Sequence, residues 1–145
     1  MRIQFTKSRS PHSNDNGLVE SKNGSVIRKL YGYCHIPQHY ADSLTELNSG
    51  PLYCYVNFHR PCYFPSTTTD KKGKQKKVYR YKDMMTPYEK FRSLPRASQY
   101  LKPGVTFKKL DAFACEMTDN DAVEKLHSAR DILFKKLHER LKVRA

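Results

Sequence analysis

The sequence predicts an α+β fold that is mainly helical and carries one β-hairpin. Apolar side chains recur at three- and four-residue spacing over most of the chain, and the helical stretches begin at capping residues or at a proline. Alternating or β-branched residues are confined to a short N-terminal segment and to one central segment. The strands are predicted within 2–7 and 62–83, and the helices within 15–31, 37–58, 86–95 and 106–142.

Charge is the strongest feature of the composition. The 145 residues include 27 Lys or Arg against 14 Asp or Glu, a net charge of +13. Such an excess predicts a polyanionic partner, most simply nucleic acid. No apolar run approaches the ~18 residues of a membrane span, and no signal peptide is visible. Four irregularly spaced cysteines argue against a secreted disulfide scaffold, so we expect a cytoplasmic protein without a membrane partner.

The first two elements are a strand and a helix. Ile3 and Phe5 share one face of the strand predicted over 2–7, which needs neighbours that the chain does not obviously offer. Capping residues then start the helix predicted over 15–31, and Gly32 is expected to end it. Because the strand lacks sheet partners, we expect the apolar face of this helix to lack a core.

The middle of the chain is predicted to be helix, hairpin and helix. A helix starts after Pro37, is expected to break at Gly50-Pro51, resumes over 52–58 and stops at Pro61. Residues 62–83 then form a hairpin, with strands near 64–69 and 78–81 and its tip around Gly73. A short helix follows from Thr86-Pro87 and is closed by Pro95.

The tail is predicted to hold two helices. The first spans about 106–117, and the second runs from a capping cluster at 118–121 to about 142. We expect the second helix to pack in cis or to lie in solvent rather than to form a coiled-coil dimer. We also expect a loose, marginally stable assembly centred on 40–60 and 84–142. The apolar stripe of the long helix is Ala122, Leu126, Ala129, Leu133, Leu137 and Leu141.

Glu20 is the first candidate for chemistry. It lies in the first turns of the predicted helix beside polar and basic residues, which hold a carboxylate ionised, as a metal ligand must be. The plainer interpretation is a glutamate that complements the helix dipole.

Three short motifs resemble the transposase and retroviral-integrase family. The run 16–23, Asn-Gly-Leu-Val-Glu-Ser-Lys-Asn, resembles the family's N/Q-G/A-x-V-E-S-x-N around its third acidic residue. Residues 57–61 resemble N-x-x-R-P, and 86–89 resemble T-P-x-E. Residues 5–11 are similar to the strand and loop that precede the glutamate in some bacterial insertion-sequence transposases. The resemblance covers about 3–95 and, for the bacterial group, extends to the end of the chain.

The resemblance implies a ribonuclease-H-like core in which Asp, Asp and Glu hold two Mg²⁺ ions. These metals activate a water or a DNA 3′-hydroxyl for in-line attack on a phosphodiester. Glu20 matches the third carboxylate, which in the family is both a catalytic residue and a metal ligand. The neighbouring residues of its helix would face double-stranded DNA. The residues that the resemblance assigns to DNA are Lys22, Asn23, Arg28, Lys29 and Arg60.

The chain departs from the family because the two aspartates are missing. In relatives they lie upstream, and no aspartate of this sequence has a matching strand context. We therefore expect the C-terminal part of a nucleoid-associated bacterial transposase, inactive in strand transfer until an Asp-bearing half completes the Mg²⁺ site. Its parts are the end of the catalytic core over 1–61, a basic hairpin insertion over 62–83 and a helical region over 84–145.

The hairpin is a second candidate site. Its cations could contact the DNA backbone through counterion release, or they could simply keep a solvated loop soluble. The residues concerned are Lys71, Lys72, Lys74, Lys76, Lys77 and Arg80.

Other functions stay open from the sequence. The chain could be a non-catalytic nucleic-acid-binding or partner-binding protein, or a truncated product that binds and inhibits a full-length transposase. Its candidate protein partners are therefore a full-length transposase or further copies of itself in a homo-oligomer. A zinc site is disfavoured because the spacing fits no known zinc motif, and free thiols are expected instead. Its candidate ligands would be Cys34, His35, His39, Cys54, His59 and Cys62.

Overall fold

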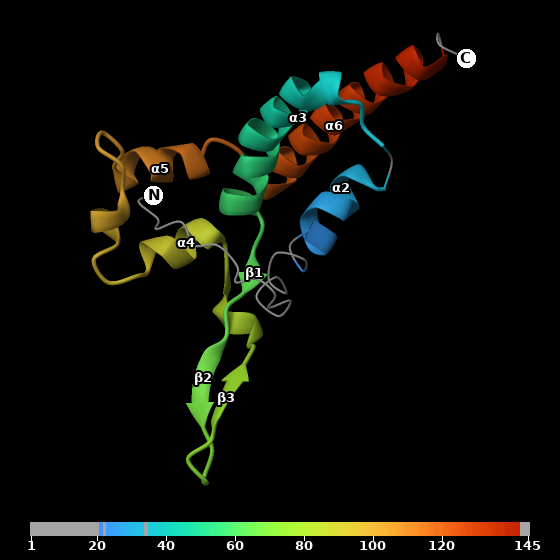
Figure 1. The fold of residues 1–145 in the computed structure, drawn as a ribbon. Helices are drawn as coiled ribbons and strands as arrows, with labels where there is room; N and C mark the ends of the chain where they lie inside the picture. Colours follow the sequence, from blue (N-terminus) through green and yellow to red (C-terminus); the bar gives the residue numbers. More distant parts are fainter. Residues whose placement is uncertain (1–20, 22, 34, 143–145) are drawn as a thin grey trace.

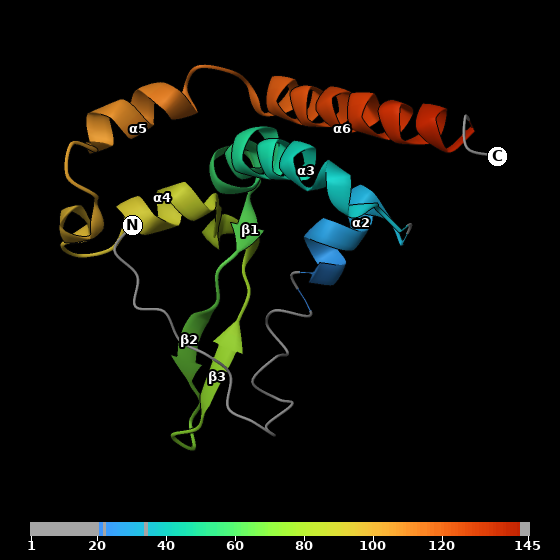
Figure 2. The same ribbon diagram turned by 45° about the horizontal axis from the view of Figure 1, so that its top comes forward.

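A computed structural model describes residue 21 and residues 23–33 and 35–142. The described part is mainly helical and contains two small antiparallel sheets of two strands each. Figures 1 and 2 show a long C-terminal helix lying along a second helix, with a hairpin pointing away from both. The α+β, mainly helical prediction is confirmed at this level.

The first described helix comprises the π turn η2 (Asn23–Ile27) and α2 (Arg28–Tyr31). It ends at Gly32, whose φ of 71° lies in the left-handed region and whose N–H donates to the Arg28 carbonyl at 2.9 Å. The predicted strand over 2–7 and the start of the helix lie outside the described residues. The expectation that this helix lacks a core is wrong, because Val26 and Leu30 pack against the main apolar cluster.

The second helical region is continuous where the sequence predicted a break. It comprises η3 (Gln38–Tyr40), α3 (Ala41–Leu47), η4 (Asn48–Leu52) and η5 (Tyr55–His59). The predicted break at Gly50-Pro51 does not occur, since the chain continues as the π turn η4 with Pro51 inside it. A π turn does not require the amide that proline lacks, so the local widening accommodates the ring. The helix ends at His59, and Arg60 is extended.

The predicted hairpin is confirmed, with shifted strand bounds. β2 (Ser66–Thr69) pairs antiparallel with β3 (Gln75–Val78), so the second strand begins earlier than the sequence suggested. At the base of the hairpin, β1 (Cys62–Tyr63) pairs with β4 (Met84–Met85). The 3₁₀ turn η6 (Tyr81–Asp83) connects β3 to β4.

Two short helices follow the hairpin. α4 (Pro87–Arg92) begins with a capping box, in which the Thr86 hydroxyl accepts the Glu89 N–H and the Glu89 carboxylate accepts the Thr86 N–H. The 3₁₀ turn η7 (Ala97–Tyr100) leads to α5 (Phe107–Ala114), shorter than the predicted 106–117. Tyr88 joins the two helices by donating its O–H to Asp111 at 2.6 Å.

The long helix α6 (Asp119–Lys142) packs in cis, as predicted. Thr118 caps it by accepting the Asp121 N–H, while the Asp121 carboxylate accepts the Thr118 N–H. The Thr118 hydroxyl also donates to the Asp121 carboxylate at 2.7 Å, and this bond, followed by the one from the Thr118 N–H, lowers the pKa of Asp121. The buried cluster unites α6 with α2 and with the second helical region. It consists of Tyr31, Tyr40, Leu47, Leu52, Leu126, Leu133 and Leu137. Within the described ranges, we find no helix long and apolar enough to cross a membrane.

Candidate nucleic-acid interface

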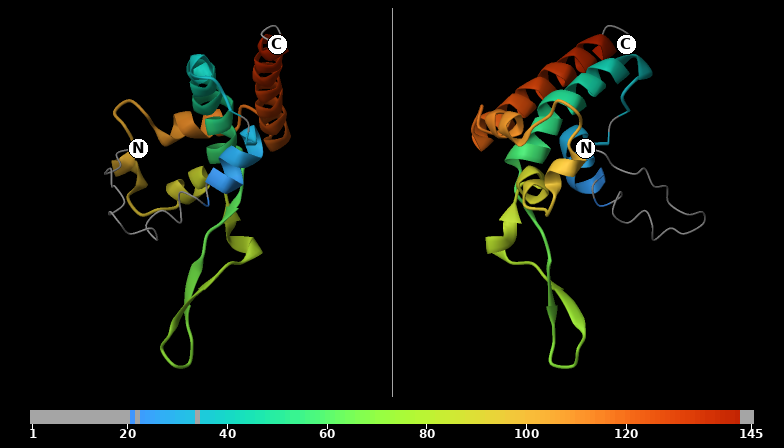
Figure 3. Two further views of the ribbon diagram at one scale, coloured as in Figure 1. Left: turned by 45° about the vertical axis from the view of Figure 1, so that its right-hand side comes forward. Right: turned by 90° about the vertical axis from the view of Figure 1, so that its left-hand side faces the viewer.

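The basic hairpin projects from the helical body. Two further views show β2 and β3 extending well beyond the helices, with α2 beside the base of the hairpin (Figure 3). The cations of the ribbon are exposed and can meet a large anion. The exposed cations of this segment are Lys71, Lys72, Lys74, Lys76, Lys77, Arg80 and Lys82.

Asp70 folds the tip of the hairpin. Its carboxylate Oδ1 accepts the backbone N–H of Lys72 at 2.8 Å and that of Lys74 at 2.9 Å. The Gly73 N–H donates to the Asp70 carbonyl at 3.0 Å, and Gly73 has a φ of 76°. Such an Asx turn brings three lysines together at the tip.

The second acid of the hairpin is also engaged in structure. Asp83 accepts a hydrogen bond of 2.7 Å from the Ser66 hydroxyl and fixes the base of the ribbon. Both carboxylates thus hold backbone or hydroxyl groups of the fold, and neither makes an ion pair with a lysine among the described contacts. The lysine charges are therefore not compensated within the ribbon.

The strand register distributes the lysines over both faces. Thr67 lies opposite Lys77, and Thr68 lies opposite Lys76. Because consecutive side chains of a strand point to opposite faces, Lys76 and Lys77 present their ammonium groups on different sides. Each lies opposite a threonine across the ribbon, and the Thr68 hydroxyl donates to the Lys76 carbonyl at 3.3 Å.

Two of the cations predicted on the helices meet at a cavity of about 210 Å³. Lys29 reaches it from α2, and Arg60 reaches it from the end of η5. The Arg28 guanidinium instead lies over the Tyr33 ring, 5.5 Å from its centroid, while Asn23 is exposed on η2. The structure therefore brings together Lys29 and Arg60 but not the whole predicted set.

Sequence reasoning missed two residues of this cavity, His127 and Arg130 on α6. They follow the stripe positions Leu126 and Ala129 by one residue each. The helical period indicates that they flank the apolar stripe, but no pattern tells which neighbour covers that flank. Only the packing of α2 beside α6 could reveal them.

The metal centre expected by resemblance is not built from the described residues. Glu20 and Lys22 lie outside them, and in the part of the chain that the structure describes no three His, Cys, Asp or Glu side chains could hold a metal ion. The described residues therefore do not fit a Mg²⁺ site on their own.

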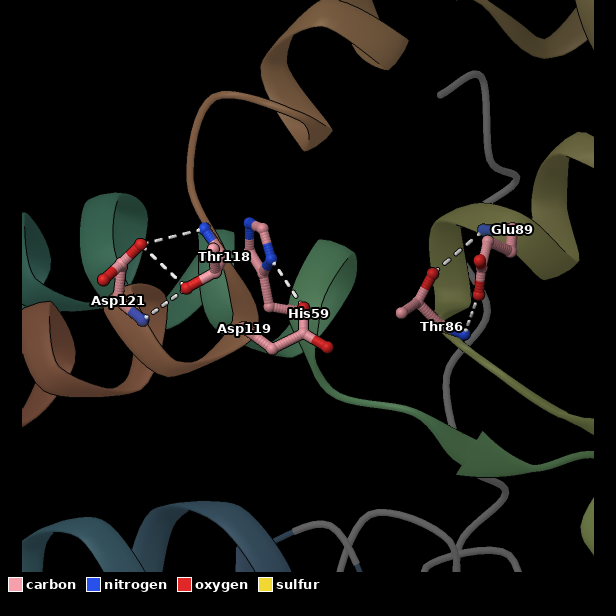
Figure 4. A network of polar contacts seen from close by, with 6 residues as sticks. All are labelled: His59, Thr86, Glu89, Thr118, Asp119 and Asp121. Atoms are coloured by element: carbon pink, nitrogen blue, oxygen red, sulfur yellow. Dashed lines mark hydrogen bonds and ion pairs between the residues drawn. The ribbon is translucent and has the colours of Figure 1, made fainter.

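The candidate zinc ligands have other roles. Cys54 and Cys62 are free thiols, and burial raises the pKa of the Cys54 thiol. His59 is almost fully buried, and its Nδ1 lies 3.0 Å from Asp119 Oδ1 (Figure 4). Cys34 lies outside the described residues. The sequence did not indicate that His59 would pair with Asp119, which lies sixty residues further along the chain.

Comparison with models of protein families, with curated proteins and with solved structures gives no match.

Proposed function

We propose that this chain binds double-stranded DNA as the C-terminal part of an integrase-type transposase. One observation carries the DNA-binding proposal: a projecting ribbon with lysines on both faces, whose two acids are occupied by the fold. The assignment to a transposase rests on the three motifs at 16–23, 57–61 and 86–89 and their order.

The ribbon suits contacts with the phosphate backbone. A two-stranded ribbon fits the major groove of B-DNA, where its outer edges run close to phosphates on both sides. Lysines are compact, strongly hydrated charges, so they position a strand without reading its bases. We therefore expect binding that is weakly dependent on sequence and strongly dependent on salt.

The binding test compares two variants of equal charge. The first removes Lys71, Lys72, Lys76 and Lys77 from the hairpin as glutamines. The control removes Lys108, Lys125, Lys135 and Lys136, which are exposed on α5 and α6. Fluorescence anisotropy with a labelled duplex then gives the affinity between about 50 and 200 mM salt.

The hairpin variant is expected to lower the slope of log K against log salt by roughly 3–4, because each phosphate contact contributes about 0.9. The control should change it much less. Equal slopes for the two variants would contradict the proposed interface, whatever the absolute affinity.

Strand transfer requires the missing half. Glu20 is proposed as the third carboxylate on the resemblance alone, so we expect Mg²⁺-dependent strand transfer only after an Asp-bearing half is supplied. In that complete protomer, Glu20→Gln should abolish strand transfer and leave folding intact. Activity like that of the wild type in this variant would refute the assignment of Glu20 as the third carboxylate, and with it the motif on which the transposase assignment rests. The DNA-binding proposal would stand, because the hairpin test does not depend on Glu20.

A further inference from the structure

We propose that the cavity between α2, the end of η5 and α6 is a second phosphate site for the same DNA duplex. Its basic residues are Lys29, Arg60, His127 and Arg130. The proposal rests on the proposed DNA-binding function and adds a binding site formed by the tertiary structure.

Basic side chains from three separate segments converge on this cavity. Lys29 belongs to α2, Arg60 follows η5, and His127 and Arg130 lie one turn apart on α6. Among its described lining residues there is no aspartate or glutamate. Asp131 pairs with Arg130, whereas Lys29 and Arg60 make no ion pair among the described contacts, so their like charges at one hollow favour a negatively charged ligand.

Arg130 retains hydrogen-bonding capacity toward such a ligand. Its Nε donates to Asp131 Oδ1 at 2.8 Å, and one terminal nitrogen lies 2.7 Å from the same oxygen. A guanidinium has five N–H donors in a planar fork, so this pair leaves others for a phosphate oxygen. Asp131 thereby orients the guanidinium and does not line the cavity itself.

The cavity is built on the main core and is therefore pre-formed. Val26, Leu30, Tyr55, Val56 and Leu126 line its floor, and all belong to or pack against the buried cluster. The long basic side chains can lie over this apolar floor with their charged ends toward solvent.

A hydrogen bond also fixes α2, which carries Lys29. The Tyr31 hydroxyl donates to Asn48 Oδ1 at 2.6 Å and ties α2 to η4. Because the backbone that carries Lys29 is already fixed, phosphate binding need not order it, and only the side chains lose conformational freedom.

The position of Arg60 identifies the ligand as DNA rather than a free nucleotide. Arg60 stands two residues before β1, the strand at the base of the hairpin. The views agree that α2 lies beside this base (Figures 1–3). A duplex held by the ribbon would thus pass the cavity, and the two sites together would clamp two separate backbone positions.

The test again uses a matched pair in the full chain. Lys29→Gln with Arg60→Gln removes two cavity charges, while Lys108→Gln with Lys135→Gln removes two exposed charges elsewhere. We expect the cavity variant to lower the salt slope for duplex binding by about 2 and the control to change it little. Lys29→Arg with Arg60→Lys should keep the wild-type slope. Circular dichroism and thermal unfolding check that each variant folds.

The outcomes separate the two proposals. A cavity variant that matches its control, while the hairpin variant still lowers the slope, would overturn the second site and leave the DNA-binding function standing. No change in any variant would overturn both. A further arm titrates inorganic phosphate and a mononucleotide by calorimetry. Binding of these that is lost in the cavity variant, with the duplex slope unchanged, would show a site for free phosphate and overturn the inference.

Discussion

His59 is buried beneath the N-terminus of α6, with its Nδ1 3.0 Å from Asp119 Oδ1 (Figure 4). A carboxylate oxygen accepts hydrogen bonds, so the N–H at His59 Nδ1 is the donor in this contact. Nε2 is buried and has no hydrogen-bond partner among the described residues. This contact fastens the last turn of the second helical region to the first turn of α6.

Removing the carboxylate should therefore loosen that junction. Asp119→Ala leaves the buried Nδ1 donor without an acceptor and is expected to lower the free energy of unfolding by about 1–2 kcal/mol. Urea unfolding measures the change. Asn120→Ala, in the same exposed turn, serves as the control, and equal losses in the two variants would contradict a specific role for the pair.

Tyr88 gives a prediction about pH. Burial, followed by the hydrogen bond to Asp111, raises the pKa of Tyr88 from 10.0 to about 12. Between these values the unfolded chain releases the proton and the folded chain keeps it. The stabilisation is therefore complete below pH 10.0 and is lost as pH rises toward 12.

Tyr88→Phe should reduce stability by about 1 kcal/mol at neutral pH and remove the late phenol titration from the ultraviolet spectrum. The exposed Tyr63→Phe is the control. A phenol in Tyr88 that titrates together with the exposed tyrosines would refute the prediction.

The stripe of α6 predicts contrasting effects at adjacent residues. Leu133 is 5% exposed within the core, whereas its neighbour Ile132 is 59% exposed. Leu133→Ala should lower the free energy of unfolding by about 2–5 kcal/mol. Ile132→Ala should leave it within about 0.5 kcal/mol of the wild-type value. Thermal or urea unfolding distinguishes them. A large loss at Ile132 would instead place α6 in an interface with another chain.

Replacing each of two glycines with alanine should change the stability of the chain in opposite directions. Gly73 has a φ of 76° and open space around it, so Gly73→Ala costs only backbone strain, about 1–2 kcal/mol. We expect faster hydrogen exchange at the Lys74 amide and weaker DNA binding.

Gly24 also has open space around it but lies inside the helical segment η2 with no positive φ. Gly24→Ala should therefore stabilise the chain by about 0.5–1 kcal/mol. A stabilised hairpin in Gly73→Ala, or a destabilised helix in Gly24→Ala, would contradict the respective local conformation.

Local chemistry was readable in the sequence. The stop at Gly32, the helix start at Thr86-Pro87 and the turn at Gly73 depend on neighbouring residues only, so each was predicted and each is confirmed. The apolar stripe of α6 likewise predicted a buried face. The charge of +13 and the lysines of the hairpin depend on composition and not on the fold.

Only the tertiary structure decided what those faces meet. The sequence placed a break at Gly50-Pro51 and left the helix around Val26 without a core, yet packing against α6 supports both segments. Lys29, Arg60 and Arg130 converge because three helices share one core. Periodicity along a chain reports the distance to the next turn of the same helix. It carries no information on which distant element covers a given face, because that choice is made by side-chain packing across the whole fold.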